Sequence, residues 1–380
     1  MKATQTAAEK FDAIVIGAGI IGCACADRLT QQGLRVLVIE SSTVGGGTTA
    51  AGMGHLVVMD DNPAELALSA HSLELWRAFA ADTQLNRQRN EYLACGTIWV
   101  ATDEEEMTAA SAKQKTLAAH GIASTLMNAR ALAEAEPNCR AGLAGGLLVH
   151  EDAIVYPPKS AQILLERAIS KGAQLLRARV ASLVDGGVQL SDGSVCLARE
   201  TIVANGMASL ELVPELPLRY KKGQLVITER YPKFIRHQLV ELGYIKSAHA
   251  SDGDSVAFNL QPRPTGQILI GSSRQFDVTH KEIDLKILSA MLAQAASFVP
   301  AIAQLKALRT WTGFRAATPD GLPYIGPHPT REHVWLATGH EGLGITTSLG
   351  TADILSNQIC GLSSAIGHQA YLPQRAHCTH

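Results

Sequence analysis

The sequence lacks the features that mark several large classes of protein. Its 33 basic and 35 acidic side chains leave a formal net charge of −2, so no basic excess exists to attract nucleic acid or an anionic membrane. The seven cysteines are scattered without a CxxC pair, which predicts structural thiols and no metal site. No run is apolar and long enough to span a bilayer, and the first ten residues hold no apolar leader core. We therefore expect a cytoplasmic protein with no nucleic-acid partner and no membrane span; peripheral association with the inner membrane stays an alternative.

The chain also lacks any repeat, low-complexity tract or Pro/Ser-rich linker. With 380 residues, 46% of them hydrophobic, it can bury a large core and is expected to form two domains. Because no linker separates them, the domains are predicted to interleave along the chain.

The clearest pattern lies near the N-terminus. FDAIVI is a short apolar run typical of a strand, and GAGIIG follows it; CACADRLTQQG then predicts a helix that ends at Gly33. LRVLVIE is a second strand, ending in Glu40. Gly17, Gly19 and Gly22 therefore fall where a strand turns into a helix, which is the context that a GxGxxG pattern needs.

This turn suits the pyrophosphate of a dinucleotide. The first glycine permits the turn, the second lets the pyrophosphate approach the backbone, and the third lets the helix pack on the strand. The free N–H groups of the helix start then face the phosphates. Glu40 suits the hydroxyl pair of an adenosine ribose and disfavours a 2′-phosphate. NAD and FAD share this half, so the unit alone does not choose between them.

The next stretch, SSTVGGGTTAAGMGHL, is a loop of glycines, threonines and small residues that can lie close to a flat cofactor. The alternative is a flexible surface loop. The stretch SSTVGGGTTAAGMGHL resembles the loop after the second strand in the D-amino acid oxidase (DAO) family of flavoenzymes, especially glycine oxidase and the sarcosine oxidase β subunit. Further segments resemble that family over roughly residues 11–362: CGTIWVAT, DAIVYPPKSAQILLERAISKGAQL (with Ala153 in place of a glycine), ETIVANGMAS, WTGFRAATPDGLPYIG and VWLATGHEGLGITTSLGTADIL.

The resemblance implies an α/β (α+β) fold: a Rossmann-type FAD-binding domain with an interleaved antiparallel-sheet substrate domain. Short β-rich segments such as QLVIT, SVAFNL and QILIGS independently predict that second sheet. In EIDLKILSAMLAQAASF, an apolar helical stripe is expected to pack in the core: Leu285, Leu288, Met291, Leu292 and Ala295. The predicted boundaries are 11–85, 143–215 and 309–366 for the FAD domain, and 86–142 and 216–308 for the substrate domain.

FAD is thus the expected cofactor. The residues expected to hold it come from the N-terminal unit, the loop after it, the re-entering strands and the C-terminal segment: Gly17, Gly19, Ile20, Gly22, Glu40, Ser41, Gly47, Thr48, Thr49, Ala51, Gly52, Met53, Val180, Ala204, Gly206, Gly342, Leu343, Gly344, Ile345 and Thr346.

Arg315 is the main substrate-binding candidate. In the stretch WTGFRAATPDG the family places an arginine that binds the substrate carboxylate, and the planar guanidinium suits that task. The alternative is that Arg315 pairs with Asp320 or caps a turn. The implied chemistry is hydride transfer from the substrate α-carbon to flavin N5, giving an imine, and it requires no protein base if the neutral amine reacts.

Other candidates are less specific. His55 is a possible base or ring contact, with hydrogen-bonded scaffold as the alternative. Tyr244 and Tyr220 could reach a carboxylate or simply pack in the sheet. After His340, where glycine oxidase carries an arginine, this chain has Glu341 and a glycine, so glycine is not the expected substrate.

Within the family, TTAAGMGHLVVMDD and the compact length look closest to the flavin subunits of D-hydroxyproline and opine dehydrogenase complexes. The expected function is therefore dehydrogenation of a secondary or D-amino acid, with a hydroxyproline-like imino acid first, alongside partner subunits that carry further redox cofactors. The alternatives are a glycine or sarcosine oxidase that uses oxygen, an opine dehydrogenase subunit, a flavin electron-relay or assembly subunit, and an NAD-dependent dehydrogenase.

Overall fold

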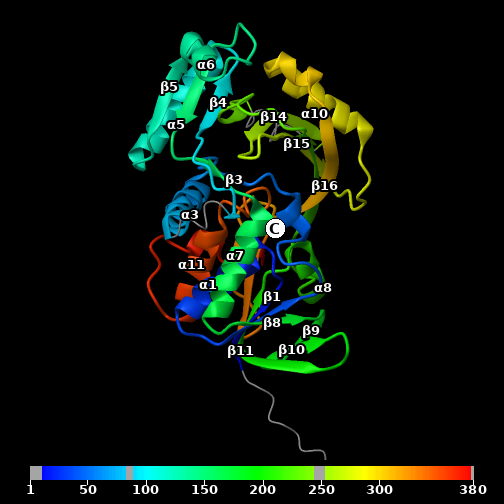
Figure 1. Ribbon diagram of the computed structural model, residues 1–380. Coiled ribbons are helices and arrows are strands. Elements are labelled where there is room, and N and C mark those ends of the chain that lie inside the picture. Colours follow the sequence, from blue (N-terminus) through cyan, green and yellow to red (C-terminus); the bar gives the residue numbers. More distant parts are fainter. Residues whose placement is uncertain (1–10, 83–88, 244–252, 378–380) are drawn as a thin grey trace, which may run out of the picture.

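The computed structural model describes residues 11–82, 89–243 and 253–377. Its strands form two large sheets, one in each half of the molecule, with a short ribbon of β3 (His55–Leu56) and β7 (Ala153–Ile154) between them (Figure 1). Within these three stretches every helix is too short or too polar to cross a bilayer. The helices are α1 (Ile20–Gln31), α2 (Gly47–Ala51), α3 (Pro63–Asp82), α5 (Glu104–Ala119), α6 (Ala129–Ala135), α7 (Pro157–Ser170), α8 (Ser209–Leu212), α10 (Leu285–Phe298) and α11 (Ser348–Ile359).

The first sheet contains the N-terminal strand–turn–helix unit. Its order is β17-β18-β11-β1-β2-β8, and the β9–β10 hairpin joins β11. All pairs from β18 to β8 are parallel, whereas β17 runs antiparallel to β18. The strands are β1 (Phe11–Ile16), β2 (Val36–Glu40), β8 (Gln174–Arg177), β9 (Val180–Val184), β10 (Gly187–Leu190), β11 (Val195–Val203), β17 (Tyr324–Pro327) and β18 (Val334–Thr338).

The apolar runs of β1 and β2 form the centre of this sheet because both of its faces are covered. Helices α7 and α11 both pack against α1 beside the sheet (Figure 1). Since the central strands are parallel, their carboxyl ends lie at one edge. The turn after β1, the end of β2 and the segment after β11 meet there, as the sequence predicts for a Rossmann-type unit.

The second sheet is almost wholly antiparallel. Its order is β16-β12-β15-β14-β13-β4-β6-β5, and only β13 and β4 run parallel. The β-rich segments read from the sequence form three adjacent strands of it, β12, β15 and β14, so the predicted substrate sheet is present. The strands are β4 (Thr97–Ala101), β5 (Ser124–Asn128), β6 (Gly145–Val149), β12 (Arg219–Thr228), β13 (Gln238–Glu241), β14 (Ser255–Pro262), β15 (Ile268–Phe276) and β16 (Ala307–Ala317).

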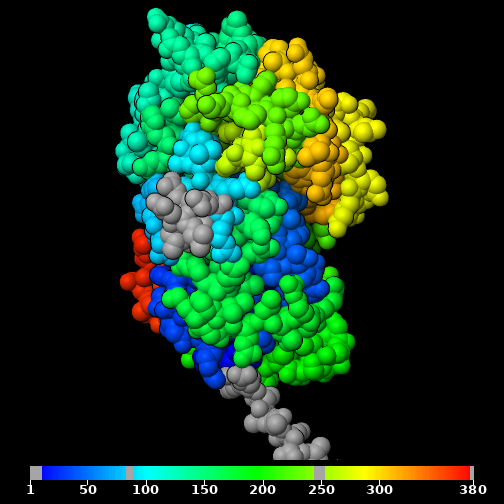
Figure 2. Space-filling view, in the orientation of Figure 1, coloured from blue at the N-terminus to red at the C-terminus, as the bar shows by residue number. Residues whose placement is uncertain are grey.

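The chain passes between the two halves several times. Strands β6 and β16 belong to the second sheet, whereas the boundaries drawn from the sequence assign most of both strands to the FAD domain. Strand β16 runs from the upper half toward the first sheet, and α2 contacts it (Figure 1). Figure 2 shows the blue segment that contains α2 reaching up to the orange β16. We retain the interleaved division as a proposal, with these two strands shared between the halves.

Helix α10 departs from the predicted stripe. Met291 and Ala295 are fully buried against β14 and β15, but Leu285 is 72% exposed and Leu292 is 36% exposed. The prediction that all five apolar residues pack in the core is therefore wrong for these two leucines. Asp284 caps the helix by accepting from the amides of Lys286 and Ile287, and the buried residues of α10 begin only at Met291, so its first turn, with Leu285, lies beyond the edge of the core.

Candidate active site

The glycine-rich turn after β1 leads into α1, whose first amide, that of Ile20, donates to Thr49 Oγ1 at 3.0 Å. Gly17 has a φ of +100°, and a Cβ there would lie 2.8 Å from the Ala204 carbonyl oxygen. A Cβ on Gly22 would lie 1.9 Å from the Gly17 oxygen, so α1 packs directly on the turn. Gly19 precedes α1 and offers no side chain to its first amides. The turn has the open, positively polarised geometry of a phosphate site.

Glu40 lies at the same edge of the sheet. Its Oε2 accepts from the Ala18 amide at 2.7 Å, and its Oε1 accepts from the Ser42 amide at 2.6 Å. These bonds hold the carboxylate at the end of β2, where it lines a cavity together with Gly17 and Gly19. An acid at this position can face the ribose of an adenine dinucleotide.

The loop after β2 is fixed from the second sheet. Thr48 Oγ1 donates to the Phe314 carbonyl at 2.6 Å, and Trp311 Nε1 donates to the Ala51 carbonyl at 3.1 Å. At the other end of the loop, Gln261 Nε2 donates to the carbonyl of Met53 at 2.9 Å. The loop is therefore an ordered bridge between the two sheets, and the alternative of a flexible surface loop is wrong.

The residues predicted to hold the cofactor surround one cavity of about 1160 Å³. Gly22 is the exception, because it lies under the turn against Gly17. The cavity-lining residues are Gly17, Gly19, Ile20, Glu40, Ser41, Gly47, Thr48, Thr49, Ala51, Gly52, Met53, Val180, Ala204, Gly206, Gly342, Leu343, Gly344, Ile345 and Thr346. The cavity also reaches the second sheet, so one space connects the glycine-rich turn with Arg315.

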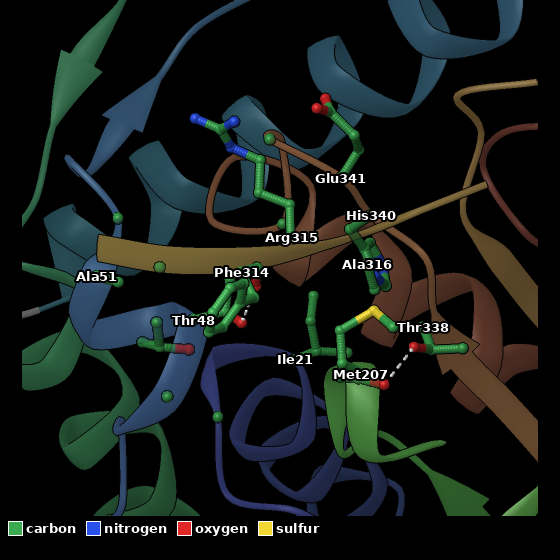
Figure 3. Close-up of a pocket in the computed structure, with 18 of the residues that line it drawn as sticks. Ile21, Thr48, Ala51, Met207, Phe314, Arg315, Ala316, Thr338, His340 and Glu341 are labelled. Atoms are coloured by element: carbon green, nitrogen blue, oxygen red, sulfur yellow. Dashed lines mark hydrogen bonds between the residues drawn. The ribbon is translucent and has the colours of Figure 1, made fainter. Parts of the chain in front are cut away.

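Arg315 lies half-buried on β16, facing this cavity. Its Nη1 donates to the Ser273 carbonyl at 3.1 Å. A Cβ on Gly223 would lie 2.8 Å from Nη2, so the guanidinium rests on the bare backbone of β12. In Figure 3 the side chain projects to the opposite side of β16 from Ile21 and Met207. Within the described part of the chain the guanidinium makes this one hydrogen bond, which leaves further donors of the planar fork for a ligand.

The alternative role of Arg315, pairing with Asp320, is wrong. Asp320 pairs instead with Arg375, whose Nε lies 2.6 Å from Oδ2. Arg375 also lies over the ring of Tyr324, 4.4 Å from its centroid. Asp320 is thus part of a C-terminal cluster, and Arg315 has no partner in it.

Two further cations share the sheet face with Arg315. Lys221 is paired in register with both Arg315 and Phe276, and Arg274 precedes Phe276 by two residues. Because paired residues, and residues two apart on a strand, point to one face, all three cations face the cavity, which they line. Lys221 Nζ lies 2.8 Å from Oε1 of Glu341. Sequence reasoning missed Lys221 and Arg274, since only strand register brings them to Arg315.

Glu341 is ionised in this setting. Burial alone would raise its pKa, but the charges of Lys221, Arg315 and Arg274 outweigh burial and lower the pKa to about 2. Burial in turn lowers the pKa of Lys221, and Glu341 opposes that shift. Glu341 is therefore an ionised carboxylate beside three cations at neutral pH.

The two histidines near the cavity are neutral. Burial lowers the pKa of His55 to about 4 and that of His340 to about 3. His55 Nδ1 is hydrogen-bonded to Gln238 Oε1, and His340 Nε2 lies 2.9 Å from Thr351 Oγ1. His55 lines the cavity but is a weak proton acceptor at such a pKa.

The tyrosine candidates are placed unequally. Tyr220 lines the cavity and packs edge-on against Phe314, with ring centroids 5.7 Å apart. Tyr244, the other predicted substrate contact, lies outside the described residues, so its role stays a prediction.

Comparison with known proteins agrees with this geometry. Residues 12–358 match the family DAO, FAD dependent oxidoreductase. Glycine oxidase of Geobacillus kaustophilus is 26% identical over 352 residues, 89% of this chain and 90% of that protein. One of the subunits of the opine oxidase of Rhizobium meliloti is 22% identical over 369 residues, 92% of this chain and 93% of that protein.

Solved structures show the same fold. Glycine oxidase from Geobacillus kaustophilus superposes with a TM-score of 0.85 at 24% identity, covering 96% of this chain and 99% of that one. L-proline dehydrogenase from P. horikoshii gives 0.88 at 20% identity, covering 98% and 99%. The chain belongs to the FAD-dependent oxidoreductase (DAO) family. It is an FAD-dependent oxidoreductase.

The residues present fit FAD. The turn at Gly17 and Gly19 has the backbone approach that a pyrophosphate needs, Glu40 lies at the ribose position, and the ordered loop gives the cavity a wall of small residues. These groups would hold the cofactor between the two sheets. In the described stretches, no three His, Cys, Asp or Glu side chains gather as metal ligands would.

Proposed function

We propose that this chain oxidises a small secondary or D-amino acid to its imine, with a proline-like imino acid such as D-hydroxyproline as the first candidate. The observation that carries the proposal is Arg315, whose guanidinium lies in the cavity on the face of the second sheet. A planar cation held by Ser273 over Gly223 suits a carboxylate bidentately.

The chain would contribute position and charge. Arg315 would bind the carboxylate and so fix the α-carbon in the cavity, while the ordered loop after β2 would exclude water. FAD, when bound, supplies the acceptor for the hydride that leaves the α-carbon. His55 would shape the wall of the cavity as a neutral side chain, because its low pKa makes it a poor base.

The choice of substrate rests on the chain's own departures from glycine oxidase. Glu341 stands after His340 where the resemblance expects an arginine nearby, so the pocket carries an anion that a glycine site would lack. An opine is the second candidate, because a subunit of an opine oxidase is a relative and because Lys221 and Arg274 add cations beside Arg315. A glycine or sarcosine oxidase is the third.

An anaerobic flavin-bleaching screen tests this function. Glycine, sarcosine, both prolines, the hydroxyproline epimers and opines are mixed with the purified protein without oxygen, and loss of flavin absorbance is followed. We expect hydroxyproline or proline epimers to bleach the flavin fastest. Fastest bleaching by an opine or by glycine would replace the first substrate with that one, and no bleaching by any amino acid would favour an electron-relay or assembly role.

We also propose that the chain is a cytoplasmic catalytic subunit that passes electrons to a partner. The opine oxidase relative is itself one subunit of an enzyme, and the described residues form no metal-ligating group through which electrons could leave singly. Co-expression with genomic neighbours, followed by sizing and cofactor analysis, should yield a hetero-oligomer with a second redox cofactor. A stable homo-oligomer that reduces oxygen as fast as it oxidises substrate would contradict this prediction.

A further inference from the structure

Glu341 has an unfavourable backbone conformation. Its φ is +48°, in the left-handed region that residues with a Cβ adopt at a cost. The segment around it contains Gly339, Gly342 and Gly344, so glycine would suit position 341 better on conformational grounds. A strained residue that is not glycine, at the wall of a cavity, points to a functional reason for its side chain.

The carboxylate of Glu341 is also costly to bury. Its side chain is 18% exposed, and Oε1 lies 2.8 Å from Lys221 Nζ. Oε1 is buried, and Lys221 Nζ is the donor beside it. An ionised carboxylate has about four lone-pair sites on its two oxygens, so a further donor on a ligand in the cavity would stabilise it.

Glu341 and Arg315 are held in a fixed relation. The Glu341 amide donates to the Ala316 carbonyl at 3.0 Å, which joins the Glu341 segment to β16 next to Arg315. Figure 3 shows both side chains projecting to the same side of β16, away from Ile21 and Met207. An α-amino or imino acid carries a carboxylate and a nitrogen with N–H donors only two bonds apart along its backbone. A cation and an anion presented together match these two groups.

We propose that Glu341 binds the nitrogen of the substrate by accepting its N–H on the carboxylate, while Arg315 binds the substrate carboxylate. This inference rests on the proposed function and narrows it to substrates that keep an N–H on the reacting nitrogen. Lys221 pairs with Glu341 and fixes the orientation of its side chain. Asp61 and Glu65 line the same cavity from the side of α3, but burial raises the pKa of Glu65 to about 8, so it carries little charge at neutral pH.

A pair of ligands that differ in one atom tests the inference. D-Proline is followed by the concentration that half-saturates anaerobic flavin reduction. Tetrahydrofuran-2-carboxylate, in which oxygen replaces the ring N–H, is followed by its perturbation of the flavin spectrum. Glu341→Gln should lower the affinity for the imino acid by about 10- to 100-fold and leave the affinity for the oxygen analogue unchanged. Arg315→Lys should lower the affinity for both ligands.

Two further variants complete the design. Glu341→Gly removes the side chain while fitting the left-handed backbone, so it should fold, keep FAD and show the same selective loss. Asp277→Asn is the matched control. Like Glu341, Asp277 has a left-handed backbone, with φ of +57°, and it forms an ion pair with a basic residue of β12, Arg219, at 2.6 Å. Unlike Glu341, its side chain is 61% exposed. It should leave both ligands unaffected.

The inference fails if Glu341→Gln and Glu341→Gly leave the affinity for both ligands unchanged, or lower both affinities equally. An equal loss with a lower melting temperature would make Glu341 a structural partner of Lys221 between the two halves. Failure of the proposed function is a separate result: the native protein would then be reduced by no amino acid, whatever residue stands at position 341.

Discussion

Arg315→Ala should abolish most turnover while the protein stays yellow. The guanidinium donates to a main-chain carbonyl and faces the cavity, so its removal would leave a substrate carboxylate in a partly desolvated site without a cation. The expected loss is about 2–5 kcal/mol of binding, at least about 30-fold in kcat/KM. Flavin content should not change, because the cofactor residues come from the glycine-rich turn and the loop after β2. The measurement is steady-state kinetics with the amino acid that bleaches the flavin fastest.

A second variant tests whether the position of the Arg315 guanidinium matters, as well as its presence. Gly223→Ala keeps Arg315 but places a methyl group 2.8 Å from Nη2, so the guanidinium must move. We expect KM to rise by a smaller factor than in Arg315→Ala, again with full flavin content. Unchanged turnover of every amino acid in both variants would show that Arg315 has a structural role only.

Gly19→Val should give a folded protein without colour. Gly19 is the residue at which a pyrophosphate would approach the backbone, and a Cβ there would already lie 3.3 Å from Thr49 Oγ1. The larger side chain would fill the phosphate position in front of α1. Flavin absorbance per protein measures the loss, and circular dichroism measures the fold.

Gly253→Val is the control for this variant. Gly253 has open space around the position of a Cβ, so the same substitution there should retain FAD. Full flavin content in Gly19→Val would contradict the assignment of the turn to the pyrophosphate.

Some of this site could be predicted from the sequence because it is local. The strand, the glycine spacing, the helix and Glu40 lie within about thirty consecutive residues, and their roles follow from backbone geometry. Arg315 could be singled out through family resemblance, although Asp320 remained a competing partner until the structure placed it beside Arg375.

Other parts depend on relations that no local pattern contains. Lys221 and Arg274 meet Arg315 only through the register of β12, β15 and β16. The left-handed conformation of Glu341 is unexpected for a residue with a Cβ. The exposure of Leu285 depends on where the second sheet ends under α10, which an amphipathic period cannot reveal.

Gly223 on β12 is paired with Gly313 on β16, so neither strand carries a side chain at this position. The guanidinium of Arg315 lies against Gly223, and Ala51 lies against Gly313, where a Cβ would come within 2.4 Å of the Ala51 Cβ. These two contacts set the distance between Arg315, the proposed carboxylate-binding cation, and the loop after β2 that lines the cavity. A different substrate sheet grafted onto this nucleotide-binding half would therefore need a glycine at both of these positions.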